Sequence, residues 1–125
     1  MPSTDNKQSA KKFLELIIAG KIEDAYQIFI DMGGKHHNVF TPAGFEALKA
    51  GMKEAHTKYP NKQFTIQHII GDEDLVAVHS HLVLEEKTLD LITMHLFRFN
   101  NGKIVEMWDF SQAILAEVPN KDGVF

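Results

Sequence analysis

The sequence predicts an α+β domain in which helices precede an antiparallel sheet. Helical periodicity is confined to residues 3–59 and alternating periodicity follows, with Pro60 at the change. Helices that come before the strands, rather than between them, favour α+β over a parallel α/β sheet. With 125 residues, the chain is expected to form a single domain over residues 1–125.

Three helices are expected before Pro60. The first ends at Gly20 and has apolar residues at helical spacing, namely Ala10, Phe13, Leu14 and Ile17. The second carries an apolar side over residues 22–29, after which residues 33–40, GGKHHNVF, are interpreted as a polar loop. The third is expected to start at Thr41 and Pro42, because proline tolerates the first helical position, and to run to Tyr59.

Four strands are expected after Pro60, at residues 64–71, 75–85, 89–99 and 103–115. Each is rich in β-branched or aromatic residues, and the short connections GDED, EEKT and NNGK indicate hairpins. The strands are apolar on nearly both faces. We therefore expect the helices to cover one face of the sheet and a second copy of the chain to cover the other.

Composition excludes several classes of function. The chain has no cysteine, so it lacks disulfides, cysteine zinc sites and thiol nucleophiles. Its net charge is -4 and its basic residues are scattered, which argues against a nucleic-acid partner. No segment has the pattern of a signal peptide or the length of an apolar membrane span, so no membrane partner and a cytoplasmic location are expected.

Histidines in the predicted strands suggest a binding pocket. His79 and His81 are two residues apart and therefore share a face, His95 lies on the next strand, and Asp109 on the one after. A sheet that brings all four to one surface would place a polar patch in an apolar wall. His95 and Asp109 have mainly apolar neighbours, so each needs a polar partner if it is buried.

The turn before the last strand decides whether His95 and Asp109 meet. A two-residue loop of Asn101 and Gly102 would set His95 against Trp108, whereas a three-residue loop that adds Asn100 would put His95 and Asp109 on one face. We favour the three-residue loop, in which glycine takes the left-handed position.

Two alternatives accompany this site. The four side chains are of types that bind zinc or iron, but the usual spacing of further ligands is absent and no metal is expected. Trp108 fits either core packing or a pocket wall.

The run MHLFRFNNGKIVEMWDFSQ resembles the closing hairpin of the SnoaL-like polyketide cyclase family, within the nuclear transport factor 2 like superfamily. The family pattern is matched by Phe97, Arg98, Gly102, Lys103, Ile104, Glu106, Trp108, Asp109 and Gln112. The order of the preceding segments, including the pair His37–Asn38, agrees along nearly the whole chain.

The resemblance implies a cone in which a strongly bent sheet wraps around the helices and encloses an apolar pocket, in a homodimer formed by the outer sheet face. It also implies acid and base chemistry without a cofactor, such as aldol cyclisation, isomerisation or dehydration, on a small apolar molecule that carries oxygen. Some members of the family only bind ligands or dimerise, which is the alternative function.

The resemblance suggests roles for single residues. Asp109 matches the aspartate that serves as acid and base in the cyclases. His95 stands where ketosteroid isomerases have a hydrogen-bonding aspartic acid, so this replacement argues against isomerase activity. We expect Asp109 and His95 to be catalytic, and His37, His79, His81 and Trp108 to contact the substrate.

Overall fold

A computed structural model describes residues 3–85 and 88–125 of the chain. Three helices are present in these ranges, α1 (Ser3–Ile18), α2 (Ile22–Phe29) and α3 (Phe45–Lys58). The strands are β1 (Ile30–His36), β2 (Gln63–Asp72), β3 (Leu75–Glu85), β4 (Leu89–Asn100) and β5 (Lys103–Ala113). Among the helices described, none is long and apolar enough to cross a membrane.

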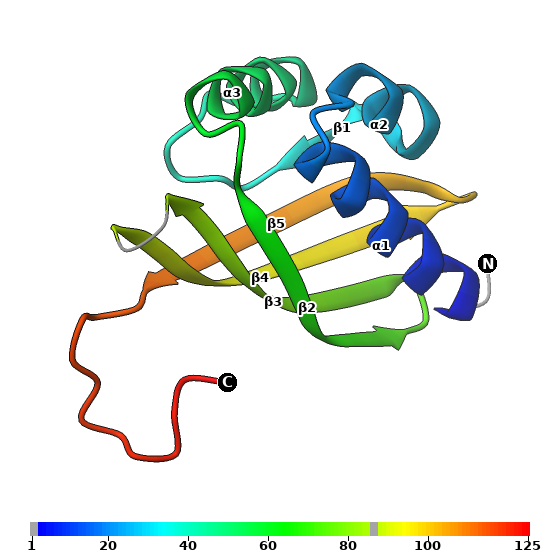
Figure 1. Ribbon diagram of the computed structural model, residues 1–125. Coiled ribbons are helices and arrows are strands. Elements are labelled where there is room, and N and C mark those ends of the chain that lie inside the picture. The colour runs from blue at the N-terminus through cyan, green and yellow to red at the C-terminus, as the bar shows by residue number, and fades with distance from the viewer. Residues whose placement is uncertain (1–2, 86–87) are drawn as a thin grey trace.

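The strands form one open, mixed sheet with the order β1-β5-β4-β3-β2. Strands β2 to β5 pair as antiparallel neighbours, as the sequence predicts, and β1 pairs with β5 in parallel. The helices lie on one face of the bent sheet, and the C-terminal tail runs below the other face (Figure 1). The fold is therefore the α+β cone that the resemblance implies. The predicted turn between β3 and β4 includes residues 86–87, which lie outside the described ranges.

The polar loop predicted for residues 33–40 is wrong in its first half, where the chain forms strand β1. The register between β1 and β5 is irregular between Ile30 and Lys35, so β1 makes few regular pairs. A Cβ atom on Gly34 would collide with the carbonyl oxygen of Val105. Glycines that suggested a loop thus allow a bulged edge strand to approach β5 closely.

The third helix begins three residues later than predicted, at Phe45 instead of Pro42. The Pro42 carbonyl oxygen accepts a hydrogen bond from Nε2 of His36, with the two atoms 2.8 Å apart. Pro42 therefore belongs to the loop that connects β1 to α3, and this loop carries part of the site described below.

The core lies between the helices and the inner face of the sheet. The ring of Phe13 on α1 packs edge-on against Phe97 on β4, with the centroids 5.8 Å apart, and Tyr26 packs similarly against Phe45. Phe13, Phe45 and Phe97 are completely buried. These contacts fix α1, α2 and α3 above the sheet, because each helix contributes an aromatic ring to the same cluster.

The β4–β5 hairpin turns on two residues, so the predicted three-residue loop is wrong. Asn101 and Gly102 have φ angles of 51° and 77°, and Asn100 pairs with Lys103. Positive φ at both central residues is typical of the type I′ turn that Asn-Gly favours. The register then shifts by one residue after Phe99, where Val105 has no partner on β4. This bulge, rather than a longer loop, sets the pairing of the rest of the hairpin.

Candidate active site

His95 and Asp109 lie directly opposite each other on β4 and β5. Paired residues on antiparallel strands point to the same face. The face is the inner one, since Phe97 and Met107, each two residues along its strand, are buried in the core. The expected meeting of His95 and Asp109 is therefore present, and the bulge at Val105 produces it.

Asn38, which follows β1, holds the carboxylate of Asp109. Its Nδ2 donates hydrogen bonds to both oxygens, at 3.1 Å from Oδ1 and 2.9 Å from Oδ2. Its Oδ1 accepts from the backbone N–H of Phe40 and from the hydroxyl of Thr41, both at 2.9 Å. Because a backbone N–H can only donate, it requires the amide oxygen on that side and so directs the NH₂ group to Asp109.

A buried histidine fixes the same loop. His36 Nε2 faces the Pro42 carbonyl, which only accepts, and Nδ1 lies 3.1 Å from the backbone N–H of Asn38, which only donates. These partners require a neutral imidazole with its proton on Nε2. His36 therefore connects the two ends of the loop and presents Asn38 to the carboxylate.

Burial dominates the electrostatics of His95. It lowers the pKa of the imidazole, and the negative charge of Asp109 opposes this effect in part. Nδ1 of His95 is buried and has no hydrogen-bond partner among the described residues. A neutral ring offers one N–H donor and one acceptor, so the inner face holds a polar group that the protein itself leaves without a complete set of partners.

The hydroxyl of Tyr26 lies on the helical side of this region. Desolvation raises its pKa strongly, and the charge of Asp109 adds to the shift. The hydroxyl donates to Sδ of Met52, at 3.1 Å. Tyr26 is therefore a neutral core side chain near the carboxylate, and it does not line the cavity described next.

A cavity of about 430 Å³ opens beside His95 and Asp109. Leu82, Leu91 and Thr93 of the inner sheet face line it, and Asn38, Val39 and Phe40 border it from the loop after β1. Phe110 and Ser111 of β5 complete the border on the strand side. A carboxylate and an imidazole thus share an apolar pocket large enough for a small molecule.

The structure separates His79 and His81 from this pocket. On β3 the residue opposite His95 is Val78, while His79 pairs with Met94 and His81 with Ile92. Neighbouring residues on a strand point to opposite faces, so both histidines lie on the outer face. The prediction that His79, His81, His95 and Asp109 share one surface is wrong, and the zinc or iron set considered for them is divided between two faces.

The outer face carries its own histidine cluster. The Nδ1 atoms of His68 and His79 are 3.0 Å apart, and the ring planes differ by only 3°. The ring centroids are 5.2 Å apart, so the two rings meet edge to edge through their Nδ1 atoms. His81 bonds through Nε2 to Oδ1 of Asp90, and the ring of Phe125 lies over His81, with the centroids 4.7 Å apart.

His37 and Trp108 form a different contact from the one predicted. Trp108 pairs with Leu96 on the outer face, so it is neither in the core nor a wall beside His95. His37 stacks on its ring at a centroid distance of 5.1 Å, and Arg98 approaches the ring to 5.9 Å. His37 borders the pocket. Its ring is turned toward the outer face, because Nε2 bonds to Glu106 there, at 2.7 Å.

This contact stabilises the charged form of Glu106. Hydrogen bonding from His37 lowers the pKa of its carboxyl group, with further contributions from Arg98 and Lys35. The side chain of Arg98 also bonds to Asp74, at 3.0 Å. The bond between His37 and Glu106 anchors the start of the loop to β5, on the outer side of the sheet.

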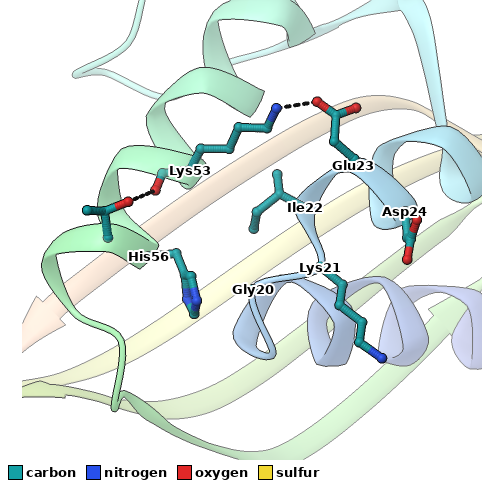
Figure 2. A pocket seen from close by; sticks show the side chains of 8 residues that line it. Gly20, Lys21, Ile22, Glu23, Asp24, Lys53 and His56 are labelled. Atoms are coloured by element: carbon teal, nitrogen blue, oxygen red, sulfur yellow. Dashed lines mark hydrogen bonds and ion pairs between the residues drawn. The ribbon is translucent and has the colours of Figure 1, made fainter.

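A second hollow, of about 340 Å³, lies between the start of α2 and α3 (Figure 2). Glu23 pairs with Lys53 across it, and the ring of His56 points toward the turn at Gly20 (Figure 2). The charged side chains are exposed to solvent. The hollow lacks a buried polar group that could act on a ligand, so the pocket at Asp109 is the better candidate.

Sequence reasoning missed Asn38 as the partner of Asp109, and it missed His36 as the residue that fixes the loop of Asn38. Their signal was the polar cluster HHN next to two glycines. The sequence could not show that these residues end a strand paired with β5, which is what brings them to Asp109.

Comparison with known proteins agrees with this fold. Residues 10–107 match the model of the SnoaL-like domain. No curated protein matches the chain.

Several solved structures share the fold. A protein from Jannaschia sp. CCS1, described as a SnoaL-like polyketide cyclase, has a TM-score of 0.71 and 18% identity, covering 87% of this chain and 86% of that one. An NTF-2 like protein of unknown function from Burkholderia xenovorans LB400 has a TM-score of 0.73 and 16% identity, covering 93% and 89%. An LEH-like epoxide hydrolase from M. tuberculosis has a TM-score of 0.68 and 14% identity, covering 88% and 84%.

These structures are similar in fold, and the match to the family model spans most of the chain from α1 to the middle of β5. The motif of the last hairpin and the helices-then-sheet order lead to the same assignment. The chain belongs to the SnoaL-like domain family.

Proposed function

We propose that the chain is an enzyme that moves protons on a small apolar carbonyl compound, using Asp109 as the base and His95 as the hydrogen-bond donor. The observation that carries this proposal is the carboxylate of Asp109, held by Asn38 and set opposite His95 in an apolar cavity. Enolisation and aldol closure both need a base beside an acidic carbon and a donor for the oxygen that becomes negative.

The division of roles follows from the two environments. The Asp109 carboxylate has acceptor capacity left after its bonds to Asn38, so it can take a proton from the carbon next to a carbonyl group. Burial favours the neutral form of His95, which can donate one N–H to the enolate oxygen without carrying a full charge. Return of this proton by Asp109 to a different carbon completes an isomerisation. In a cyclisation the enolate carbon attacks a second carbonyl group of the same molecule, and Asp109 returns the proton to the alkoxide oxygen that forms.

Hydrogen–deuterium exchange tests this function without knowledge of the natural substrate. In D₂O, the protein is expected to accelerate the exchange of protons next to the carbonyl of simple methyl ketones, followed by NMR. Asp109→Asn should lower the accelerated rate by about 100-fold or more, and His95→Ala by about 10-fold or more. Asp90→Asn, which alters an acidic residue on the outer face, is the matched control and should keep the wild-type rate.

Three results would contradict the proposal. These are no acceleration over buffer by the wild-type protein, a full rate in Asp109→Asn, and a loss of rate in Asp90→Asn as large as that in Asp109→Asn. Ketone binding without any exchange would instead favour the non-catalytic ligand-binding module of the same fold.

We also propose that a second copy of the chain covers the outer sheet face, where Met94 and Phe110 are exposed. Contiguous exposed apolar side chains on a sheet indicate an interaction surface. Light scattering is expected to give twice the monomer mass, and Met94→Lys should return the mass to that of the monomer. A monomer mass for the wild-type protein would contradict this. The cytoplasmic location stays a prediction from composition.

A further inference from the structure

The mouth of the pocket is made of apolar side chains that are almost completely exposed. Phe40 is exposed to 91% and Val39 to 86%, and both border the cavity that contains His95 and Asp109. A single exposed apolar residue is ordinary, but two adjacent ones at one opening form a patch that water solvates poorly.

The exposure is built into the loop. The backbone N–H of Phe40 is fixed by Oδ1 of Asn38, and Thr41 bonds to the same oxygen. His36 closes the loop through Pro42. The loop backbone at Val39 and Phe40 is therefore held in place, and the two side chains are presented at the opening.

Polarity changes along the cavity from its floor to its mouth. The floor has the imidazole with a buried Nδ1 and the carboxylate held by Asn38. Leu82 and Leu91 form the wall between the two ends. A ligand that matches this gradient has its oxygen at one end and a hydrocarbon group at the other.

We propose that the site binds an amphiphilic carbonyl compound whose unbranched or aromatic tail leaves the pocket across Val39 and Phe40. This inference rests on the proposed function for the position of the carbonyl oxygen, near His95 and Asp109. The loop after β1 then sets specificity, because one amide, that of Asn38, positions both the catalytic carboxylate and the backbone of Phe40.

A homologous series of methyl ketones, from butan-2-one to nonan-2-one, tests the proposal by NMR titration. The dissociation constant is expected to fall by about two- to fourfold with each added methylene, because complete burial of a methylene corresponds to about fourfold. In the double variant Val39→Ser and Phe40→Ser the longer ketones should lose this gain, while butan-2-one should keep its wild-type affinity.

Ile70→Ser is the matched control. Ile70 is also exposed, but it lies on β2, at the sheet edge opposite β1, and it does not border the cavity. This variant should keep the wild-type dependence on chain length. Thermal unfolding of all variants checks that they are folded, which is expected because the altered side chains are exposed.

The proposal would be overturned if the dissociation constant for the wild-type protein did not depend on ketone length. It would also be overturned if the double variant kept the wild-type dependence on ketone length. So would a fall in molecular mass of the double variant by light scattering, which would assign the mouth to contact between copies of the chain. If chain length governs binding but the wild-type protein does not accelerate proton exchange, the proposed catalysis fails and the proposed binding mode stands.

Discussion

On the inner face of the sheet, His95 lies beside a carboxylate in an apolar pocket, whereas on the outer face His79 and His81 lie near solvent and the C-terminal tail. The same kinds of side chain occur on both faces, and Asp90 bonds His81 as a carboxylate partner. The faces differ in what covers them. The helices and the loop after β1 cover the inner face, so desolvation there lowers the pKa of His95.

This comparison shows why a histidine–carboxylate pair is not a site by itself. The pair on the outer face is open to water, and water screens the interaction of its groups. On the inner face the polar groups meet in an apolar cavity, where an incoming ligand can exclude water and strengthen electrostatic interactions. The following substitutions compare the two faces, from the largest expected effect to the smallest.

Removal of a ring from each face should give very different losses of stability. Phe97→Ala on the inner face is expected to lower the free energy of unfolding by about 3–5 kcal/mol, because the ring is completely buried against Phe13. Phe110→Ala should cost less than about 1 kcal/mol, since that ring is largely exposed. Urea denaturation measures both, and similar losses would contradict the assignment of the faces.

Removal of a polar anchor should affect the inner site more than the outer cluster. Asn38→Ala leaves Asp109 without its donor and releases Phe40 and Thr41, which should cost about 1–3 kcal/mol of stability. The rate of ketone proton exchange should fall by about 10-fold or more. His68→Ala, which removes one ring of the outer pair, should leave the exchange rate unchanged. An equal loss of rate in the two variants would count against Asn38 as the positioning residue.

The lowered pKa of His95 predicts a dependence of stability on pH. An unfolded histidine binds its proton near pH 6.5, while His95 in the folded protein binds it only at a lower pH. Between these two values the unfolded state holds more protons, so this contribution to stability is complete above about pH 7.5 and is lost as the pH falls below 6.5. The slope from this one group is at most about 1.4 kcal/mol per pH unit.

The variant His95→Gln should show a smaller fall in stability between pH 7 and pH 5 than the wild-type protein, measured by urea denaturation at each pH. Thr93→Val is the control, because it alters a polar side chain two residues away on the same inner face without removing a titratable group. The prediction is wrong if His95→Gln keeps the wild-type dependence.

The smallest effect is expected at the end of the tail. Phe125 packs on His79 and His81 but stays partly exposed. Phe125→Ala should lower the free energy of unfolding by less than about 1 kcal/mol and should not alter ketone binding, because the contact is on the face opposite the pocket. A loss of ketone affinity in this variant would show that the two faces are coupled.

Most elements of the fold could be predicted because their signals are local. Apolar residues at helical spacing indicated α1 and α2, and alternation with short turns indicated the four strands from β2 to β5. Strand β1 could not be predicted in this way. Its glycines give no apolar alternation, and its place in the sheet depends on β5, which lies about seventy residues further along the chain.

The site was predictable to the extent that it lies within one hairpin. His95 and Asp109 are close in sequence, so only the register of the turn had to be decided, and the bulge at Val105 gave the expected result by another route. His79 was misplaced because the face of a residue depends on the register between β3 and β4, and a shift of one residue reverses it.

The sequence by itself determined the α+β class, the hairpins and the presence of a polar residue on each strand of the last hairpin. The bulge at Val105, which only the structure shows, sets these two residues opposite each other. Tertiary structure alone decided that β1 joins the far edge of the sheet, that Asn38 reaches Asp109, and that the other strand histidines face outward. The physical reason is the distance along the sequence over which each signal acts. Periodicity and turn chemistry act over a few residues, whereas burial and the partners of a polar group depend on segments that only the folded chain brings together.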